Sequence, residues 1–329
     1  MTTKDRLLAM LEGKRDVFFS GEDIAKALQL SRAAVWKAVQ ALRAEGYPID
    51  AVTNKGYRLS RECDILSAQG VMKYLKPEYR SLDVTVLPTA DSTNAVVRQR
   101  AAEGAAEGCV VIAREQTAGR GRLGRRFFSP PDTGLYLSLL LRPAAYTPRQ
   151  AVCLTAAAAA AMGRAVEQLT GQAPGIKWVN DLFLRGKKVC GILTEASVGL
   201  ETGAMESMVL GVGVNVYPPR DGFPEELGTI AGSVLDHPVP DAKNRLAGEF
   251  LNAFLAFYTH PEEKAYLEDY RRWSLAVGRE VTVLSGGREA RAYAYGIDDD
   301  CRLLVRYGDG KADALSYGEI AIRLQPENA

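Results

Sequence analysis

The residues best suited to chemistry lie in a glycine- and arginine-rich segment, residues 116–130. Its central part consists of three glycines that alternate with four arginines: Gly119, Gly121, Gly124, Arg120, Arg122, Arg125 and Arg126. Guanidinium groups bind phosphate or carboxylate through paired hydrogen bonds, and glycines can adopt positive φ and let backbone amides approach an anion. The segment therefore predicts a loop that wraps a phosphorylated or carboxylated small molecule. A solvated or RNA-binding segment would have a similar composition.

A second stretch, residues 176–195, carries charges inside apolar sequence. It reads IKWVNDLFLRGKKVCGILTE, which predicts a strand, a tight Arg-Gly turn and another strand. Lys177 and Asp181 interrupt the first apolar strand, and such side chains are seldom buried without a partner. We expect both to line a site.

The elements around these two stretches indicate a mixed α/β region. Six segments are rich in β-forming residues: 84–87, 109–113, 135–141, 175–184, 188–194 and 207–216. Residues 91–94 open a helix, and residues 151–169 predict an alanine-rich helix whose small side chains suit close packing on a sheet. We expect a mixed sheet with helices on one face. Residues 244–273 predict a helix pair. A small β-barrel is then predicted by five short segments with glycine turns: 280–284, 289–296, 303–306, 313–316 and 320–324.

The N-terminal segment has the pattern of a helix-turn-helix. Ser20 and Ser31 are each placed as the N-cap of a helix, and Val35 and Val39 lie on one face of the second helix. A hairpin follows at residues 49–59, as in the wing of a winged helix.

Local charge favours DNA binding by this segment. Residues 31–61 hold six basic and two acidic side chains, a balance of +4 in a chain whose net charge is +1. The outer face of the second helix and the hairpin turn supply the candidate DNA contacts, which are Arg32, Ala33, Lys37, Gln40 and Lys55. A small helical domain with a solvated lysine face is the alternative.

The composition is that of an ordinary soluble protein, with 47% apolar and 25% charged residues. Five widely spaced cysteines and two histidines do not predict a zinc site, and they favour reduced thiols in a cytoplasm. The apolar run 151–162 is too short to span a bilayer, and the chain begins with a charged segment rather than a signal peptide. We expect a soluble cytoplasmic protein without a membrane partner.

Together, the two stretches resemble the signatures of the biotin protein ligases, a glycine-arginine loop and a Lys-Trp-Pro-Asn-Asp segment. The resemblance includes residues 91–94 (Asp-Ser-Thr-Asn) and 213–215 (Gly-Val-Asn), and it covers nearly the whole chain. Val179 stands where the family usually has proline. Because a DNA-binding pattern precedes the ligase signatures, the chain is most similar to the bifunctional bacterial type, which is both biotin ligase and biotin operon repressor.

The resemblance implies an α+β fold in three domains. These are a winged helix-turn-helix (1–62), a catalytic domain with the fold of class II aminoacyl-tRNA synthetases (63–273) and a small SH3-like barrel (274–329). The implied activity is formation of biotinyl-5'-AMP from biotin and ATP, with Mg²⁺, and transfer of biotin to a lysine of the biotin carboxyl carrier protein of acetyl-CoA carboxylase. Operator DNA is the second implied partner. The adenylate would act as corepressor, and the adenylate-bound protein would be a homodimer.

Site residues carry over from the family position by position. The candidate contacts for biotin and the acyl-phosphate are Ser92, Thr93, Asn94, Gln116, Arg120, Arg122 and Lys188. The candidate nucleotide contacts are Arg120, Arg122, Arg125, Phe127, Lys177 and Asn215. The candidate catalytic residues are Lys188, Arg122 and Asp181, and no metal held by protein ligands alone is expected. Phe127 stands where relatives often have tryptophan, so a flat face for adenine is kept but an indole donor is lost.

Several of these positions have more than one interpretation. Lys188 stands at the family's essential lysine and would act as a point charge on the carboxylate and α-phosphate, or it is a hairpin lysine in water. Asp181 would orient the incoming amine, help Mg²⁺, or pair with Lys177. Asn215 would lie at the nucleotide or serve as a strand-end turn residue. Trp178 is expected in the core.

Two other functions compete with biotin ligation. A lipoate ligase has a related fold and chemistry with a different acid, although the Gly-Arg-Gly-Arg-Leu-Gly-Arg run favours biotin. A ligand-sensing repressor without catalysis would bind the same molecules only as signals. The presence of Lys188, Arg120 and Arg122 argues against that function.

Overall fold

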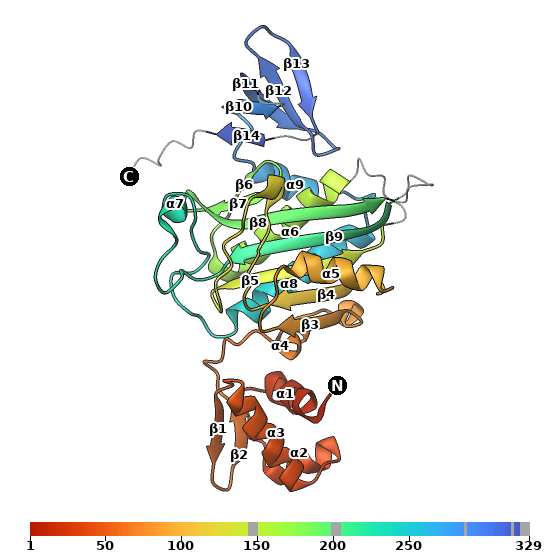
Figure 1. The fold of residues 1–329 in the computed structure, drawn as a ribbon, viewed down its shortest axis with the longest axis vertical. Helices are drawn as coiled ribbons and strands as arrows, with labels where there is room; N and C mark the ends of the chain where they lie inside the picture. Colours follow the sequence, from red (N-terminus) through yellow and green to blue (C-terminus); the bar gives the residue numbers. More distant parts are fainter. Residues whose placement is uncertain (144–150, 199–204, 286–287, 317–318, 323–329) are drawn as a thin grey trace. The chain divides into compact units, whose positions relative to one another are not determined.

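The computed structural model describes residues 1–143, 151–198, 205–285, 288–316 and 319–322 (Figure 1). The chain divides into two compact units, residues 1–80 with 238–248 and residues 81–237 with 249–329. Helices and strands occur in both units, so the predicted α+β class is confirmed. The division into three domains at 62/63 and 273/274 stays a prediction. Among the described helices, none is both long and apolar enough to cross a membrane.

The first unit begins with a helix-turn-helix and a hairpin, as predicted. Its elements are α1 (Thr3–Gly13), α2 (Gly21–Leu28), α3 (Arg32–Ala44), β1 (Ile49–Val52) and β2 (Gly56–Leu59). The Ser20 and Ser31 hydroxyls accept hydrogen bonds from backbone amides three residues later, at 3.0 and 3.1 Å, and so cap α2 and α3. Gly56 has a φ of +101° where β2 passes Phe19, and a Cβ there would lie 2.0 Å from the Phe19 carbonyl oxygen.

Residues after the hairpin also pack within the first unit. They form α4 (Ala68–Met72) and a short 3-10 helix, η1 (Pro77–Tyr79). The backbone amide of Ser67 donates to Asn244 Oδ1 at 3.0 Å, and Asn244 Nδ2 donates to the Ile65 carbonyl at 2.9 Å. An ionic cluster joins the same segments and consists of Glu12, Arg15, Lys73 and Asp241. Residues 63–80, which follow the hairpin, are therefore part of a packed structure.

The second unit is built on a seven-stranded mixed sheet, which confirms the predicted sheet. The strands lie in the order β3 (Asp83–Leu87), β4 (Cys109–Ala113), β5 (Gly134–Leu141), β9 (Met205–Asn215), β8 (Lys187–Val198), β7 (Asp181–Leu184) and β6 (Gly175–Lys177). β3 and β4 pair in parallel, and the other neighbours are antiparallel. Residues 175–184 form two strands instead of the one predicted, because β6 and β7 pair as a hairpin around a segment that includes a cis peptide at Trp178–Val179.

Helices cover both faces of this sheet (Figure 1). The helices that follow β3 are α5 (Thr93–Ala102), α6 (Ala151–Thr170), α7 (Glu225–Gly228), α8 (Ala242–Thr259) and α9 (Tyr266–Arg272), and of these α5 and α6 pack directly on the strands. Asn94 of α5 packs against Gly211 of β9, whose register partner on β8 is Leu193. The next residue, Thr194, points to the opposite face and hydrogen-bonds Thr155 of α6 at 2.8 Å. The prediction of helices on one face only is therefore wrong.

The C-terminal part of the second unit forms a separate five-stranded antiparallel sheet, so the predicted β domain is confirmed. Its strand order is β13 (Ala312–Leu315), β12 (Leu303–Tyr307), β11 (Arg288–Ile297), β10 (Arg279–Ser285) and β14 (Glu319–Ile322). Trp178 is buried, as predicted, and its indole NH donates to the Cys301 carbonyl between β11 and β12 at 3.0 Å. The end of the last predicted strand, residues 323–324, lies outside the described residues.

Candidate active site

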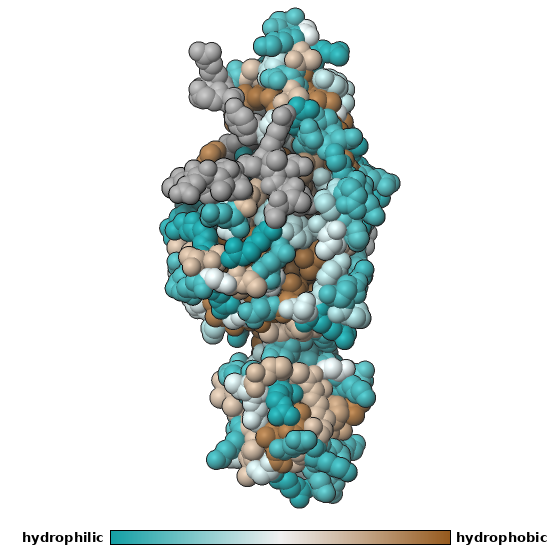
Figure 2. All heavy atoms as spheres, turned by 90° about the vertical axis from the view of Figure 1, so that its right-hand side faces the viewer, coloured by the Kyte–Doolittle hydropathy of each residue, from teal (hydrophilic) through white to brown (hydrophobic). Residues whose placement is uncertain are grey.

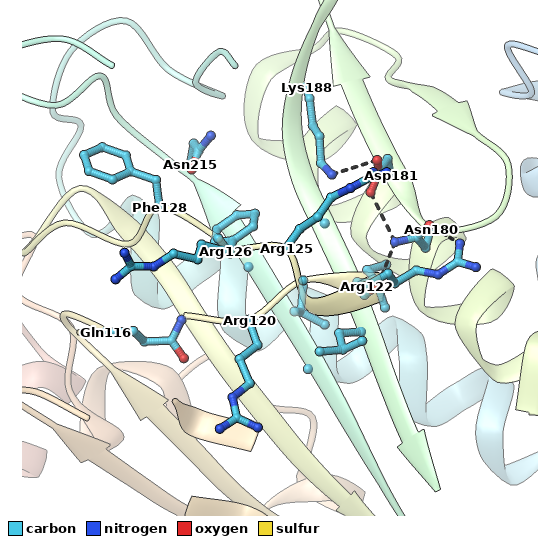
Figure 3. Close-up of a pocket in the computed structure, with 18 of the residues that line it drawn as sticks. Gln116, Arg120, Arg122, Arg125, Arg126, Phe128, Asn180, Asp181, Lys188 and Asn215 are labelled. Carbon is cyan, nitrogen blue, oxygen red and sulfur yellow. Dashed lines mark hydrogen bonds and ion pairs between the residues drawn. The ribbon is translucent and has the colours of Figure 1, made fainter. Parts of the chain in front are cut away.

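A cavity of about 440 Å³ lies in the second unit and is lined by the glycine-arginine loop, the start of α5 and strands β8 and β9 (Figure 3). Its polar lining consists of Ser92, Thr93, Asn94, Gln116, Arg120, Arg122, Arg125, Arg126, Asn180, Asp181, Lys188 and Asn215. Its larger apolar lining residues are Phe127, Phe128, Ile192, Leu193, Val212, Phe223, Leu227 and Ile230. The cavity brings together every residue predicted to bind biotin or nucleotide or to act in catalysis, except Lys177.

The glycine-arginine loop folds back on itself as a short hairpin. The amide of Gly121 donates to the Arg125 carbonyl at 2.7 Å, and the amide of Phe127 donates to the Gly119 carbonyl at 2.9 Å. A single 3-10 turn, η2 (Arg122–Gly124), forms the tip. The arginines are thus spaced along a hydrogen-bonded turn.

The three glycines of this loop differ in their backbone conformation. Of the three, only Gly124 adopts a positive φ (74°), and it follows Leu123, which is also left-handed (55°). Gly119 is required because it allows the backbone of Phe127 to approach closely: a Cβ at Gly119 would lie 2.5 Å from the Phe127 carbonyl oxygen. One glycine of the loop is therefore required for its φ, and another for its lack of a side chain.

The start of α5 forms a buried polar end of the cavity. Gln116 Oε1 accepts a hydrogen bond from the backbone amide of Thr93 at 2.8 Å, which replaces a side-chain N-cap. Gln116 Nε2 donates to Ser129 Oγ at 3.0 Å and so ties the loop to the helix. Ser92, Thr93 and Asn94 are 3–4% exposed. In the described part of the chain no protein group hydrogen-bonds the Ser92 hydroxyl, which leaves it available to a ligand.

Asn94 is held from two sides. Its Nδ2 donates to Glu195 Oε2 at 2.7 Å, and its Oδ1 accepts from Ser138 Oγ at 2.6 Å. A Cβ on Gly211 would lie 2.1 Å from Asn94 Oδ1, so only glycine fits there. These contacts fix the orientation of the Asn94 amide beside the cavity.

A chain of polar contacts links the candidate catalytic lysine to the loop. Lys188 Nζ lies 2.7 Å from Asp181 Oδ2. Asn180 Nδ2 donates to Asp181 Oδ1 at 3.2 Å and to the Ile192 carbonyl at 2.8 Å. Arg122 donates to Asn180 Oδ1 at 3.0 Å. The three candidate catalytic residues therefore belong to one network, in which Asn180 is the bridge.

Asn180 is absent from the predicted site residues. Its signal was present in the sequence, because it stands beside Asp181 as half of a polar pair in an apolar stretch. Lys177, in contrast, does not line the cavity. It is the register partner of Asp181 across the β6–β7 hairpin, but the Asp181 carboxylate pairs with Lys188. The proposed pairing of Asp181 with Lys177 is therefore replaced by a pairing with Lys188.

The four arginines of the loop point in different directions (Figure 3). Arg122 lies at Asn180, and Arg125 extends towards Asp181. Arg120 and Arg126 point away from these groups. The loop therefore presents positive charge to more than one part of a ligand.

An apolar wall that the sequence analysis did not identify completes the cavity. Its members are Phe223, Leu227, Ile230 and Ala231. The amide of Lys188 donates to the Ile230 carbonyl at 2.8 Å, and the amide of Gly232 donates to the Lys188 carbonyl at 2.9 Å. This backbone pairing with β8 holds the wall at the site. No local sequence pattern indicates the pairing.

The predicted aromatic and amide contacts for the nucleotide both lie at the cavity. The Phe127 ring packs on Gly213 and Gly191, which are paired on β9 and β8; a Cβ on Gly213 would lie 2.7 Å from Phe127 Cε1. Asn215 ends β9, and its Nδ2 donates to the Gly232 carbonyl at 3.0 Å. Gly191 and Gly213 therefore leave room on the sheet surface for the Phe127 ring.

The cavity has a large excess of positive charge. Of its lining residues, five are cationic (Arg120, Arg122, Arg125, Arg126 and Lys188) and one, Asp181, is anionic. Such a field favours an anionic ligand. The nearby Cys190 thiol is fully buried and does not line the cavity, and burial raises its pKa.

The predicted DNA contacts lie in the first unit. Arg32, Ala33 and Lys37 are exposed on α3, Gln40 is half-buried on the same helix, and Lys55 is exposed in the hairpin turn. The opposite face of α3 is part of the core of this unit.

The chain thus combines a cationic cavity in the second unit with a helix-turn-helix in the first unit, and comparison with known proteins identifies its class. Residues 86–215 match the model of the biotin/lipoate A/B protein ligase family. Residues 3–58 match an HTH domain, and residues 276–323 match the biotin protein ligase C terminal domain. The bifunctional ligase/repressor BirA of Bacillus subtilis is 34% identical over 94% of this chain and 95% of that protein. BirA of Escherichia coli is 32% identical over 97% of this chain and 96% of that protein.

The chain belongs to the biotin protein ligase family, in its bifunctional ligase/repressor branch. A solved structure, the biotin protein ligase from Aquifex aeolicus in complex with biotin and ATP, is similar with a TM-score of 0.59 and 25% identity. The match covers 74% of this chain and 99% of the Aquifex aeolicus chain.

Proposed function

We propose that this chain is an ATP-dependent biotin protein ligase. It makes biotinyl-5'-AMP and transfers the biotin to a lysine of the biotin carboxyl carrier protein of acetyl-CoA carboxylase. The observation that carries the proposal is the cavity, in which Lys188 and the loop arginines lie close to a buried polar end formed by α5. Forming an amide from a carboxylate is uphill in water, so the acid must first be activated, and an acyl-adenylate is a common activated form.

The polar end of the cavity suits the head group of biotin. The ureido ring of biotin both donates and accepts hydrogen bonds, and Ser92, Thr93 and Asn94 supply both kinds of group. Gln116 holds the start of α5 through the Thr93 amide, so its role is to position these contacts. The apolar lining near Ile192 and Leu193 suits the carbon chain.

Lys188 and Arg122 stabilise the charge that develops when biotin attacks ATP. The ammonium group of Lys188 acts on the biotin carboxylate and α-phosphate, and Arg122 on the acyl-phosphate, as preorganised charges in a partly closed site. Arg120 and Arg125 bind phosphate oxygens as pyrophosphate leaves. Phe127 and Asn215 lie where the adenosine would bind.

Asp181 holds Lys188 in place through the 2.7 Å ion pair. As the single carboxylate in the cavity lining, it also orients the amine of the incoming carrier lysine for attack on the adenylate.

Mg²⁺ enters with ATP. Magnesium prefers several oxygen ligands, and a lining with one carboxylate already paired to Lys188 does not suit a site made by protein alone. The triphosphate would supply most ligands, with Asp181 as the one available protein carboxylate.

Incubation with a purified carrier domain, ATP and Mg²⁺ tests the ligase proposal, with biotin in one arm and lipoate in the other. Mass spectrometry should find the carrier domain modified only in the biotin arm. Modification of the carrier domain only in the lipoate arm would identify a lipoate ligase. Binding of biotin without modification of the carrier domain would identify a ligand-sensing repressor without catalysis.

We also propose that the chain is a transcriptional repressor that uses biotinyl-5'-AMP as corepressor. The local charge of +4 over residues 31–61 and the exposed face of α3 support DNA binding. Ordering of the glycine-arginine loop by the adenylate builds a surface on which two chains pair. The homodimer then presents two α3 helices to an inverted repeat, so that the two half-site energies combine.

Footprinting of the promoter upstream of a biotin-synthesis operon tests this second function. Protection should appear with biotin and ATP, and carrier domain should reduce it by consuming the adenylate. Lys37→Ala should weaken binding, lower the salt slope by about 1 and leave ligation unchanged. Equal protection with and without biotin and ATP would reject the corepressor mechanism.

We also propose the types of the three domains and a cytoplasmic location for the protein. Residues 1–62 are a winged helix, residues 63–273 a catalytic domain of the class II aminoacyl-tRNA synthetase type, and residues 274–329 an SH3-like barrel. The mixed sheet of the second unit and its five-stranded C-terminal sheet support these assignments. All five cysteines are unpaired, which supports a cytoplasmic location.

A further inference from the structure

The predicted recognition helix α3 carries a large exposed aromatic side chain that is not among the predicted DNA contacts. Trp36 is 55% exposed, more than any other tryptophan, tyrosine or phenylalanine that the structure describes as exposed. Its helical neighbours Val35 and Val39 are at most 1% exposed. The packing of α3 therefore directs this indole outward.

Trp36 lies within the face predicted to meet DNA. Arg32, Trp36 and Gln40 are spaced four residues apart, so they form one column on the helix. Ala33 and Lys37 form the adjacent column. An indole at the centre of this face must enter any interface that these four neighbours make.

The far end of the same column faces the hairpin. Arg43 lies seven residues after Trp36, on the same side of α3, and its guanidinium donates to the Ile49 carbonyl of β1 at 2.7 Å. Trp36 is therefore on the side of α3 that leads towards the hairpin. In the space-filling view, apolar surface (brown) is visible among the hydrophilic side chains of the first unit (Figure 2).

We propose that Trp36 is a specificity-determining residue that recognises thymine in the operator by apolar contact with the 5-methyl group. An indole has one donor and no acceptor, so it cannot read a base edge through paired hydrogen bonds. The thymine methyl is the one apolar group that base pairs present in the major groove. The inference rests on the proposed DNA-binding function.

The test compares two forms of the footprinted promoter fragment, one made with dTTP and one with dUTP, which removes every 5-methyl group. Full-length protein with biotin and ATP is titrated with each fragment. Loss of one buried methyl corresponds to about fourfold in affinity, so two half-sites should give a loss of about fifteenfold for the wild type. Trp36→Ala should bind the thymine fragment about as weakly as the wild type binds the uracil fragment, and it should not distinguish the two.

Two variants serve as controls. Trp36→Phe keeps an apolar face and should retain most of the preference for thymine. Val17→Ala removes another exposed apolar side chain of the first unit (44% exposed) from outside α3, and it should keep the full preference. The salt slope of Trp36→Ala should equal that of the wild type, because no charge is removed. Ligation should also be unchanged in all three variants.

A Trp36→Ala variant with the same thymine preference as the wild type would overturn the inference, even if it bound both fragments more weakly. Equal binding of both fragments by the wild type would overturn it as well. If the wild type bound neither fragment, the repressor function itself would be rejected, and the inference with it.

Discussion

The ionic cluster of the first unit and the cavity of the second unit both bring lysine, arginine and carboxylate side chains together, yet their charge balance differs. The cluster holds two cations, Arg15 and Lys73, and two carboxylates, Glu12 and Asp241. Each cation pairs with both carboxylates, and all four pairs lie within 2.9 Å. The cavity lining holds five cations and one carboxylate.

Burial of the cluster supports a structural role. The Glu12 side chain is 1% exposed, and Tyr74 donates a further hydrogen bond to Asp241. Burial disfavours the charge of Arg15, but attraction to Glu12 and Asp241 outweighs it and raises the pKa of the guanidinium. Every charge of the cluster thus has a partner within the protein, so the cluster needs no ligand to balance it.

The cavity differs because its positive charge exceeds what its own carboxylate can balance. Keeping like charges close together is unfavourable unless an anion joins them. The comparison teaches that charge balance, rather than residue type, separates a structural cluster from a binding site in this chain.

The largest effect is expected for Lys188→Ala. Loss of one preorganised charge at the developing anion should cost roughly 3–4 kcal/mol in the barrier to adenylate formation, about 10²–10³-fold in rate. The fold should persist, because Lys188 is partly exposed at the cavity. Pyrophosphate release measures the rate, and Lys311→Ala, which removes an exposed lysine from outside the cavity lining, is the matched control. Near-wild-type release by Lys188→Ala would remove this residue from the chemistry.

Glu12→Gln should instead act on stability. It leaves two buried cations with one carboxylate, and breaking a buried pair in this way costs about 3 kcal/mol in the free energy of unfolding. Denaturant unfolding of the full chain measures this cost. Glu45→Gln breaks the more exposed pair with Lys4 and should cost about 1 kcal/mol or less. Equal effects of the two substitutions would show that the cluster is not a stabilising unit.

Arg122→Gly should separate adenylate formation from adenylate retention. Arg122 donates to Asn180 at the loop tip, and a lost hydrogen bond to a charged group is worth about 2 kcal/mol. The variant should still make adenylate but release it about 30-fold faster, and it should label unrelated lysines. Western blotting for biotin on a bystander protein measures the leak. The exposed Arg220, which does not line the cavity, gives the control Arg220→Gly. Strict selectivity for the carrier domain in Arg122→Gly would contradict this role.

Gly213→Ala should have the smallest effect. The added Cβ would lie 2.7 Å from Phe127 Cε1, so the ring must move. We expect KM for ATP to rise several-fold, about 1 kcal/mol, with little change in KM for biotin. Gly308→Ala adds a methyl group where no atom lies within 4 Å and is the control. An unchanged KM for ATP would show that the Phe127 position does not matter to the nucleotide.

Local sequence patterns predicted much of the fold and of the site. Ser20 and Ser31 mark two helix starts through side-chain bonds that span only three residues. The glycine-arginine loop and the segment around Asp181 are contiguous motifs, so most of the cavity lining could be named in advance. No local pattern predicted the order of the strands in the sheet.

What the sequence did not predict depends on contacts between distant segments. The apolar wall around Ile230 joins the site by pairing with β8, and α5 packs close to the sheet where Gly211 leaves space for Asn94. Lys177 was misplaced because residues 175–184 form a hairpin, which the apolar composition of a single strand does not reveal. In each case the contact joins residues that no local pattern pairs.

Calorimetric titration of biotinyl-5'-AMP into the wild type, Lys188→Ala and Glu12→Gln tests the central comparison most directly. All three proteins are measured at a temperature at which they are folded. Lys188→Ala should weaken binding about tenfold to a hundredfold, as expected for a lost hydrogen bond to a charged group, while Glu12→Gln should bind like the wild type despite its lower stability. Wild-type affinity in Lys188→Ala, or an equal loss in both variants, would contradict the assignment of the cavity charge to the ligand and of the cluster charge to the fold.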